Sequence, residues 1–189
     1  MLIACLAWGS LVWDPRDLPR RGPWFADGPL VPVEFARQSD DGRLTLVLVP
    51  GAPLVRSLWG LLDLPNLDEA VAALGTREGL QPRNFSRHIG VWNSTDPYAG
   101  DALSQRLAAW AAPLGLDALV WSNLPPRFAG EEGRIPSPWE AIRYLEGLGG
   151  EARQRAEEYV RKAPPQIDTD MRRYIELKLG WMPMTHGDS

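Results

Sequence analysis

The sequence predicts an α+β fold, in which a β-rich part is followed by a helical C-terminal extension. Short apolar runs with strand-like spacing, separated by turn residues, fill residues 1–123. The chain contains 18 Gly and 18 Pro, which favour tight turns over a helical bundle. Helical periodicity dominates after the Pro- and Gly-rich segment Leu124–Pro138. We therefore expect residues 1–123 to form a β-rich domain and residues 124–189 to form a loop and helices packed on it.

Composition excludes several classes of protein. The chain of 189 residues is 44% hydrophobic and 23% charged, which is ordinary for a globular domain. Its net charge of −4 has the wrong sign for a protein that binds nucleic acid through a basic surface. No apolar run approaches the roughly 20 residues that span a bilayer. A single Cys cannot form an internal disulfide, so we expect a cytoplasmic protein. From the net charge and the short apolar runs we expect neither a nucleic-acid nor a membrane partner. Its oligomeric state is left open.

Three strands open the chain. Leu2–Trp8 is a short apolar run that ends at Gly9-Ser10, which is typical of a buried strand and a turn. Val31–Arg37 and Arg43–Val49 also have strand-like patterns, and the Asp41-Gly42 pair between them indicates a hairpin.

A further strand and a capped helix follow. Arg56–Leu64 predicts a strand in which Gly60 marks a bulge or a close backbone approach. Asn66 with Glu69 three residues later has the pattern of a capping box. We expect the helix that starts there to end at Gly75, because glycine favours helix termination.

The rest of the chain mixes helices with short strands. Residues 76–85 predict an irregular loop, and Leu124–Pro138 a long loop or lid. Ser137, Pro138 and Glu140 have the pattern of a strong helix start. The other expected elements are strands at Arg87–Trp92 and Asp117–Ser122 and helices at Asp101–Ala112, 151–163 and 168–179.

The first candidate for chemistry is the turn Trp8-Gly9-Ser10-Leu11. Glycine reaches backbone angles closed to other residues, and successive N–H groups in such a turn can converge on a carboxylate. Ser10 lacks the G-x-S-x-G context of a hydrolase nucleophile. Taken alone, the segment is more simply an ordinary turn after a strand.

The second candidate is Glu78, within Thr76-Arg77-Glu78-Gly79. A carboxylate in a loop beside glycine can reach into a pocket and act as a general base. The alternative is a solvent-exposed acid at a helix end, paired with Arg77.

The remaining reactive residue types favour structural roles. Cys5 lies within an apolar strand, which favours a buried hydrophobe over a reactive thiol. His88 and His186 are too widely separated for a zinc site, which needs about four clustered ligands. The Arg172-Arg173 pair is most simply a solvated helix face.

Taken together, the segments resemble a known family. Residues 8–15, Trp-Gly-Ser-Leu-Val-Trp-Asp-Pro, resemble the Tyr-Gly-Ser-Leu opening of the gamma-glutamylcyclotransferase-like superfamily, particularly its ChaC-type branch. Residues 38–51, Trp59-Gly60 and Leu67–Gly79 are similar to the family's following strands and its helix ending in Arg-Glu. The resemblance covers residues 2–95, and the stretch after residue 124 lacks the family pattern.

The resemblance implies a small, mostly antiparallel β-barrel, closed or nearly closed, with flanking helices and a cavity at its mouth. It implies that backbone N–H groups of Gly9, Ser10 and Leu11 bind the γ-glutamyl moiety of a substrate, with Trp8 at the position usually held by Tyr. Glu78 takes the place of the essential acid. The implied reaction converts a γ-glutamyl amide or peptide to 5-oxoproline and a free amine, with no metal or organic cofactor.

Two departures bear on the substrate. Trp8 removes the hydroxyl of the usual Tyr, and the C-terminal helices are additional to the pattern. Glutathione, a γ-glutamyl amino acid and a γ-glutamyl amine remain open as substrates. The alternatives are a catalytically silent member that binds a small carboxylate or a partner protein, and an amide-processing enzyme with a different reaction, such as a hydrolase.

Overall fold

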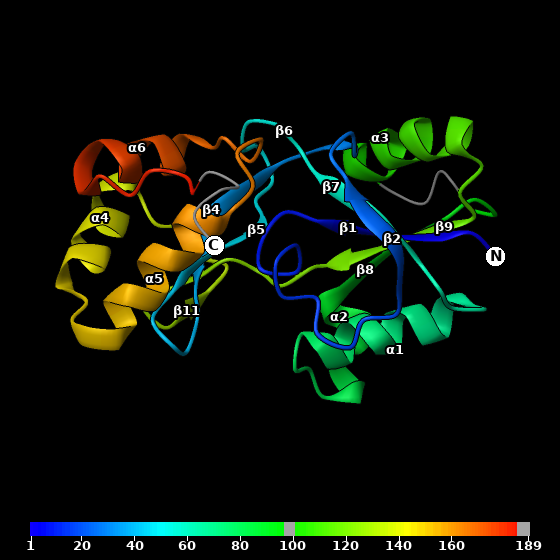
Figure 1. The fold of residues 1–189 in the computed structure, drawn as a ribbon, viewed down its shortest axis with the longest axis horizontal. Helices are drawn as coiled ribbons and strands as arrows, with labels where there is room; N and C mark the ends of the chain where they lie inside the picture. The colour runs from blue at the N-terminus through cyan, green and yellow to red at the C-terminus, as the bar shows by residue number, and fades with distance from the viewer. Residues whose placement is uncertain (97–100, 185–189) are drawn as a thin grey trace. The chain divides into compact units, whose positions relative to one another are not determined.

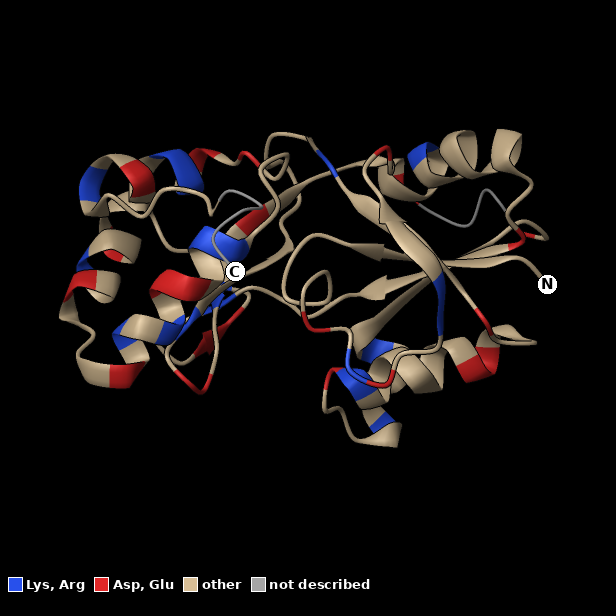
Figure 2. Cartoon of the chain, viewed as in Figure 1, with Lys and Arg blue, Asp and Glu red and all other residues tan. Residues whose placement is uncertain are grey.

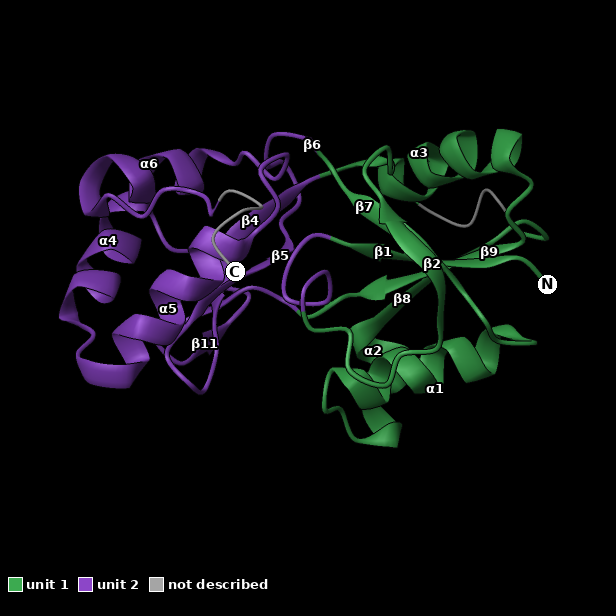
Figure 3. Cartoon of the chain, viewed as in Figure 1, with its two compact units in different colours: residues 1–7, 14–31, 56–124 green, residues 8–13, 32–55, 125–189 purple. Residues whose placement is uncertain are grey.

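The computed structural model describes residues 1–96 and 101–184. The chain groups into two compact units (Figure 3). Unit 1 comprises residues 1–7, 14–31 and 56–124, and unit 2 comprises residues 8–13, 32–55 and 125–189. The chain therefore alternates between the units, and this grouping differs from the expected division into residues 1–123 and 124–189.

Unit 1 contains a five-stranded sheet with the order β2-β7-β1-β9-β8. β1 is antiparallel to β7 and parallel to β9, and all five of its residues are buried. A strand with neighbours on both edges and cover on both faces needs a continuous apolar run, as the sequence indicates. The strands are β1 (Ile3–Ala7), β2 (Arg20–Phe25), β7 (Leu58–Leu62), β8 (Ile89–Asn93) and β9 (Ala118–Ser122).

Three helices flank this sheet. α1 (Leu67–Arg77) and α2 (Phe85–His88) lie on one side, and α3 (Ala102–Ala111) lies on the other (Figure 1). The Asn66 side chain accepts a hydrogen bond from the Glu69 N–H at 2.9 Å, which confirms the expected start of α1. The unit also contains two short 3₁₀ turns, Pro82–Asn84 and Ala112–Leu114.

At Gly60 and at Gly75, neighbouring side chains lie close to the position that a Cβ atom would take. A Cβ atom on Gly60 would lie 3.1 Å from side-chain atoms of both Arg20 and Trp24, so the close approach at this glycine is made by side chains and not by another backbone segment. The expectation that Gly75 ends the helix is wrong. Gly75 lies inside α1, where a Cβ atom would overlap the Phe85 ring. Residues 76–85 are accordingly not an irregular loop, since they include the end of α1, a 3₁₀ turn and the start of α2.

Unit 2 contains a four-stranded sheet with the order β11-β10-β4-β5. β4 and β5 form the expected antiparallel hairpin, and Gly42 between them has a φ of +91°, a conformation that favours glycine. β10 and β11 lie within the expected loop 124–138, which is therefore partly strand. The strands are β4 (Val33–Gln38), β5 (Leu44–Leu48), β10 (Arg127–Phe128) and β11 (Glu131–Glu132). β3 (Leu30–Val31) and β6 (Val55–Arg56) adjoin the unit boundaries in the sequence.

Unit 2 also contains three helices. They are α4 (Pro138–Gly147), α5 (Gly150–Lys162) and α6 (Asp170–Leu179). Ser137 and Glu140 form the expected capping box at the start of α4. Basic and acidic residues are interspersed on all three helices (Figure 2), which is typical of solvated outer faces.

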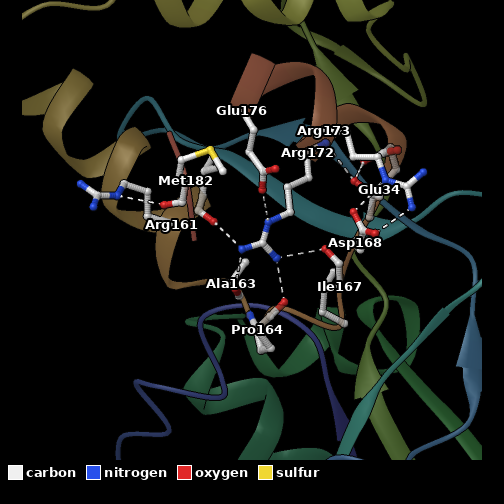
Figure 4. Close-up of polar contacts among 12 residues, drawn as sticks. Glu34, Arg161, Ala163, Pro164, Ile167, Asp168, Arg172, Arg173, Glu176 and Met182 are labelled. Carbon is white, nitrogen blue, oxygen red and sulfur yellow. Dashed lines mark hydrogen bonds and ion pairs between the residues drawn. The ribbon is translucent and has the colours of Figure 1, made fainter. Parts of the chain in front are cut away.

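Arg172 corrects the expectation that Arg172-Arg173 is a solvated pair. Its side chain is only 1% exposed, whereas Arg173 is 60% exposed and pairs with Asp168. The Arg172 guanidinium donates to the carbonyl oxygens of Ala163 at 2.8 Å and Pro164 at 2.7 Å (Figure 4). It also donates to the carbonyls of Val160 and Ile167 and to the Glu176 carboxylate. Arg172 thus fixes the connection between α5 and α6.

The described residues form an α+β structure, as expected. None of the sheets within residues 1–96 and 101–184 closes into a barrel. Among the helices of these residues, none has the length and apolar character needed to cross a membrane.

Candidate functional site

Glu78 lies at the C-terminal cap of α1 in unit 1. Its N–H donates to the Leu74 carbonyl at 2.9 Å. The chain then reverses at Gly79, whose φ is +71° and whose N–H donates to the Thr76 carbonyl. The Leu80 N–H donates to the Gly75 carbonyl, which completes a Schellman motif. The backbone of Glu78 is therefore held by a regular helix end, and Gly79 is the glycine that terminates the helix.

The Glu78 side chain is largely buried and paired. Its carboxylate Oε1 accepts a hydrogen bond from Arg77 Nη1 at 2.9 Å. The Glu78 side chain is 14% exposed and that of Arg77 is 6% exposed. The alternative of a solvent-exposed acid is therefore wrong in its exposure, although the pairing with Arg77 that it included is present.

Arg77 is itself anchored to the segment that follows Trp13 in the sequence. Its Nε and Nη2 atoms both donate to the Asp14 carbonyl oxygen, at 3.2 and 2.6 Å. Arg16 returns a bond, since its Nη1 donates to the Arg77 carbonyl at 3.0 Å. Arg16 has a φ of +51°, which is uncommon for a residue other than glycine. The two bonds to Asp14 fix the guanidinium that contacts Glu78, and the bond from Arg16 holds the Arg77 backbone.

Cys5 on β1 lies within the electrostatic reach of this pair. Burial raises the pKa of the Cys5 thiol far above its usual range, the charge of Glu78 raises it further, and Arg77 opposes the shift. The thiol donates to the Leu6 carbonyl at 3.6 Å. Cys5 is thus a neutral buried side chain, as expected, and has no thiolate to act as a nucleophile.

The Trp8–Leu11 turn belongs to unit 2. The Val12 N–H donates to the Gly9 carbonyl at 2.9 Å, which closes a four-residue turn. Trp8 and Leu11 are 4% and 5% exposed, while Ser10 is partly exposed. The buried Trp8 and Leu11 side chains hold the turn while its backbone reverses.

Position 9 requires glycine because a neighbouring side chain leaves no room for a Cβ atom, and not because of its backbone angles. Its φ lies outside the left-handed region, which corrects the reason expected for this glycine. A Cβ atom on Gly9 would lie 2.5 Å from the Tyr159 hydroxyl oxygen, a separation that real Cβ atoms essentially never show. The turn therefore packs directly against α5.

Tyr159 is held from several directions behind the turn. It is 5% exposed, and its hydroxyl accepts a hydrogen bond from the Leu46 N–H of β5 at 3.2 Å. Trp13 and Phe35 meet its ring edge-to-face, with centroids 5.4 and 6.3 Å away. The Arg43 guanidinium lies 5.4 Å from the ring centroid. The C-terminal part of the chain thus supports the turn through Tyr159.

The structure gathers Trp8, Gly9, Ser10 and Leu11 in unit 2, and Glu78 belongs to unit 1. Sequence reasoning missed Tyr159 as a neighbour of Gly9. The signal in the sequence was a Tyr among alanines and Val160, a face on which a buried hydroxyl needs a partner.

Of the two histidines, only His88 lies within the described residues. His88 ends α2, and its carbonyl accepts a hydrogen bond from the Asn123 N–H at 2.8 Å. His186 and the tail 185–189 lie outside the described residues. In the part of the chain that the structure describes, no group of three His, Cys, Asp or Glu residues is arranged to hold a metal ion.

Comparison with known proteins gives no relative. No protein-family model matches the chain, no curated protein matches it, and no solved structure matches it.

Proposed function

We propose that this chain is a gamma-glutamylcyclotransferase-like enzyme with Glu78 as its general acid and base. The observation that carries the proposal is the placement of Glu78. A largely buried carboxylate is fixed at a helix end by Arg77, yet its side chain keeps 14% of its surface exposed. A group that moves protons needs this combination of a fixed position and access to a substrate.

The proposed reaction uses the nucleophile that the substrate carries. The α-amine of a γ-glutamyl amide attacks its own γ-carbonyl carbon, and the new C–N bond closes a five-membered ring. The bond to the leaving nitrogen then breaks, which gives 5-oxoproline and a free amine. Glu78 accepts a proton from the attacking nitrogen and returns one to the leaving nitrogen. The protein accelerates the step by holding the glutamyl chain folded, since proximity alone contributes strongly to ring closure.

The turn in unit 2 supports the second part of the proposal. We assign recognition of the γ-glutamyl group to the backbone N–H groups of Gly9, Ser10 and Leu11. The buried Trp8 and Leu11 side chains and the packing of Gly9 against Tyr159 keep this backbone rigid. Fixed N–H groups stabilise a carboxylate or a polarised carbonyl at little cost in reorganisation. A small, nearly closed barrel and a cytoplasmic location belong to the same proposal.

Cys5 favours this reaction over hydrolysis through a thiol nucleophile. Its thiol is buried and its pKa is raised, so it stays neutral at physiological pH. The proposed cyclisation needs no nucleophile from the protein, because the substrate amine supplies it.

The test is a panel of glutathione, γ-glutamyl amino acids and γ-glutamyl amines, with 5-oxoproline measured by mass spectrometry. We expect the product from at least one member, and a loss of at least about 100-fold in Glu78→Gln. Asp68→Asn is the matched control, because it removes an exposed carboxylate from the other end of α1. Full activity in Glu78→Gln would overturn the mechanism. Free glutamate as the product would indicate a hydrolase, and binding of a small carboxylate without turnover would indicate a silent binding protein.

A further inference from the structure

The Arg77–Glu78 pair joins two side chains that are adjacent in the sequence. Neighbouring residues on a helix point about 100° apart and normally do not face each other. Here Arg77 Nη1 reaches Glu78 Oε1 at 2.9 Å, and both side chains are largely buried. The contact therefore needs a reason beyond the geometry of the helix.

The other bonds of Arg77 supply part of that reason. Nε and Nη2 share the Asp14 carbonyl, and the Arg77 carbonyl accepts a bond from Arg16. A buried guanidinium needs partners, because burial of an unpaired charge is strongly unfavourable. The Asp14 carbonyl satisfies two of its nitrogens on one side, which directs Nη1 toward Glu78. Arg77 thus meets Glu78 as a rigid group.

The hydrogen bond from Arg77 reaches only one of the two carboxylate oxygens of Glu78. Arg77 contacts Oε1, and Oε2 receives no hydrogen bond from any residue in the ranges 1–96 and 101–184. A purely structural Arg–carboxylate pair favours two parallel bonds, one to each oxygen. A single bond leaves the second oxygen able to exchange a proton while the carboxylate stays fixed.

We propose that Arg77 is a positioning residue for Glu78, which fixes Oε1 and leaves Oε2 as the atom that accepts and returns the proton. The inference rests on the function proposed above. Arg77 does not contact the substrate in this arrangement, so its loss lowers the rate of the chemical step and leaves substrate binding in place.

The first experiment measures kcat and KM for 5-oxoproline formation in Arg77→Gln and Arg77→Lys, on the best substrate of the panel. We expect kcat to fall about 100-fold in Arg77→Gln, with KM within about two-fold, because small displacements of a catalytic group have effects of that size. Arg77→Lys keeps a cation and recovers about ten-fold of that loss. Arg21→Gln is the control, since Arg21 forms an exposed pair with Asp63 in the same unit.

The second experiment is a crystal structure of Arg77→Gln and of Arg77→Lys, which reports on the carboxylate whether or not turnover is found. We expect Glu78 to take another side-chain rotamer in Arg77→Gln and to keep its own in Arg77→Lys. If Arg77→Gln does not fold, both the kinetics and the crystal structure are measured on Arg77→Lys, for which we expect a smaller loss of kcat.

The outcomes separate the two proposals. An active wild-type protein whose kcat and Glu78 rotamer are unchanged in Arg77→Gln would overturn the role of Arg77 and leave the function standing. A rise in KM alone would also overturn it. A wild-type protein inactive on the whole panel would overturn the function, and the positioning of Glu78 is then decided by the crystal structures.

Discussion

At the scale of single residues, Gly9 and Tyr159 show how a long-range contact determines a residue type. The Tyr159 hydroxyl occupies the space that any Cβ atom at position 9 would need. The next atom of the tyrosine, ring carbon Cζ, would lie 3.5 Å from that Cβ atom, which is an ordinary van der Waals contact. The conflict therefore belongs to one oxygen atom.

A double-mutant cycle tests this contact. We expect Gly9→Ala to lower the free energy of unfolding by about 1–3 kcal/mol through overpacking. We expect Tyr159→Phe to lower it by about 1 kcal/mol, because the Leu46 N–H loses its side-chain acceptor. Since Tyr159→Phe also removes the oxygen atom that the new methyl group of Gly9→Ala would meet, the double variant should lose less than the sum of the two. Urea unfolding of the four proteins measures the coupling.

Gly147→Ala is the control for this cycle. Nothing lies within 4 Å of a Cβ atom at Gly147, and its φ is not in the left-handed region. Its substitution should leave stability unchanged or slightly raised. Strict additivity of Gly9→Ala and Tyr159→Phe would contradict the contact.

At the scale of elements, local signals placed most helices and strands correctly. The caps at Asn66, Asp101 and Ser137 each act within three residues of the helix that they start. The end of α1 was misplaced because Gly75 serves the distant Phe85 ring, a purpose that the local sequence does not distinguish from a cap. Arg172 was misplaced for the same reason, since its partners lie on the connection before its helix.

Arg172 and Arg173 offer adjacent positions for a comparison of buried and exposed arginines. Arg172→Met should lower the free energy of unfolding by about 3–5 kcal/mol, because it removes a buried donor from four carbonyl groups and from the Glu176 carboxylate. Arg173→Met should lower it by less than about 1 kcal/mol, because its pair with Asp168 is exposed. Thermal or urea unfolding measures both. Equal losses in the two variants would show that the connection between α5 and α6 does not depend on Arg172.

At the scale of the whole molecule, the sequence indicated the α+β class but not the grouping of its segments. Each strand is a local pattern, whereas the parallel pairing of β1 with β9 joins the two ends of unit 1 and has no local signal. The same holds for residues 125–189, which group with residues 8–13 and 32–55. In the candidate site, Glu78 and the Trp8–Leu11 turn were identified by a resemblance of short motifs. The pairing of Glu78 with Arg77 was one of the alternatives, but the anchoring of Arg77 by Asp14 and the packing of Gly9 against Tyr159 were not identified, because both depend on partners remote in the sequence.

Carboxyl groups in both units contribute to the pH dependence of the free energy of unfolding. Asp41, Asp101, Glu140 and Asp168 have pKa values held below their usual range. Hydrogen bonds cause this at Asp101, Glu140 and Asp168, and at Asp41 bonds from Ser39 and Arg43 prevail over a larger opposing effect of burial. A group of this kind stabilises the fold above its ordinary pKa, and the stabilisation is lost as the pH falls through its lowered pKa. These four groups should make the protein less stable as the pH falls below about 4.

The pKa of Glu34 is shifted in the opposite direction, above its ordinary value. It is buried between β4 and the start of α6, where it accepts bonds from the Thr169 hydroxyl and the N–H groups of Phe35 and Met171. Burial raises its pKa above the ordinary value of 4.5 despite these bonds, which lower it. The contribution of Glu34 to stability is therefore fully present below pH 4.5 and is lost as the pH rises through its raised pKa.

Comparison with Glu34→Gln isolates this effect, because glutamine does not titrate. The free energy of unfolding of the wild type minus that of Glu34→Gln should be largest near pH 4 and should decrease as the pH rises toward 8. Urea unfolding of both proteins at several pH values measures the difference. A difference between wild type and Glu34→Gln that grows with pH would mean that the bonds from Thr169 and Met171 outweigh burial. The junction of β4 with α6 would then be stabilised by the ionised carboxylate, and the acid loss set by the other four carboxyl groups would be deepened by Glu34 and not opposed by it.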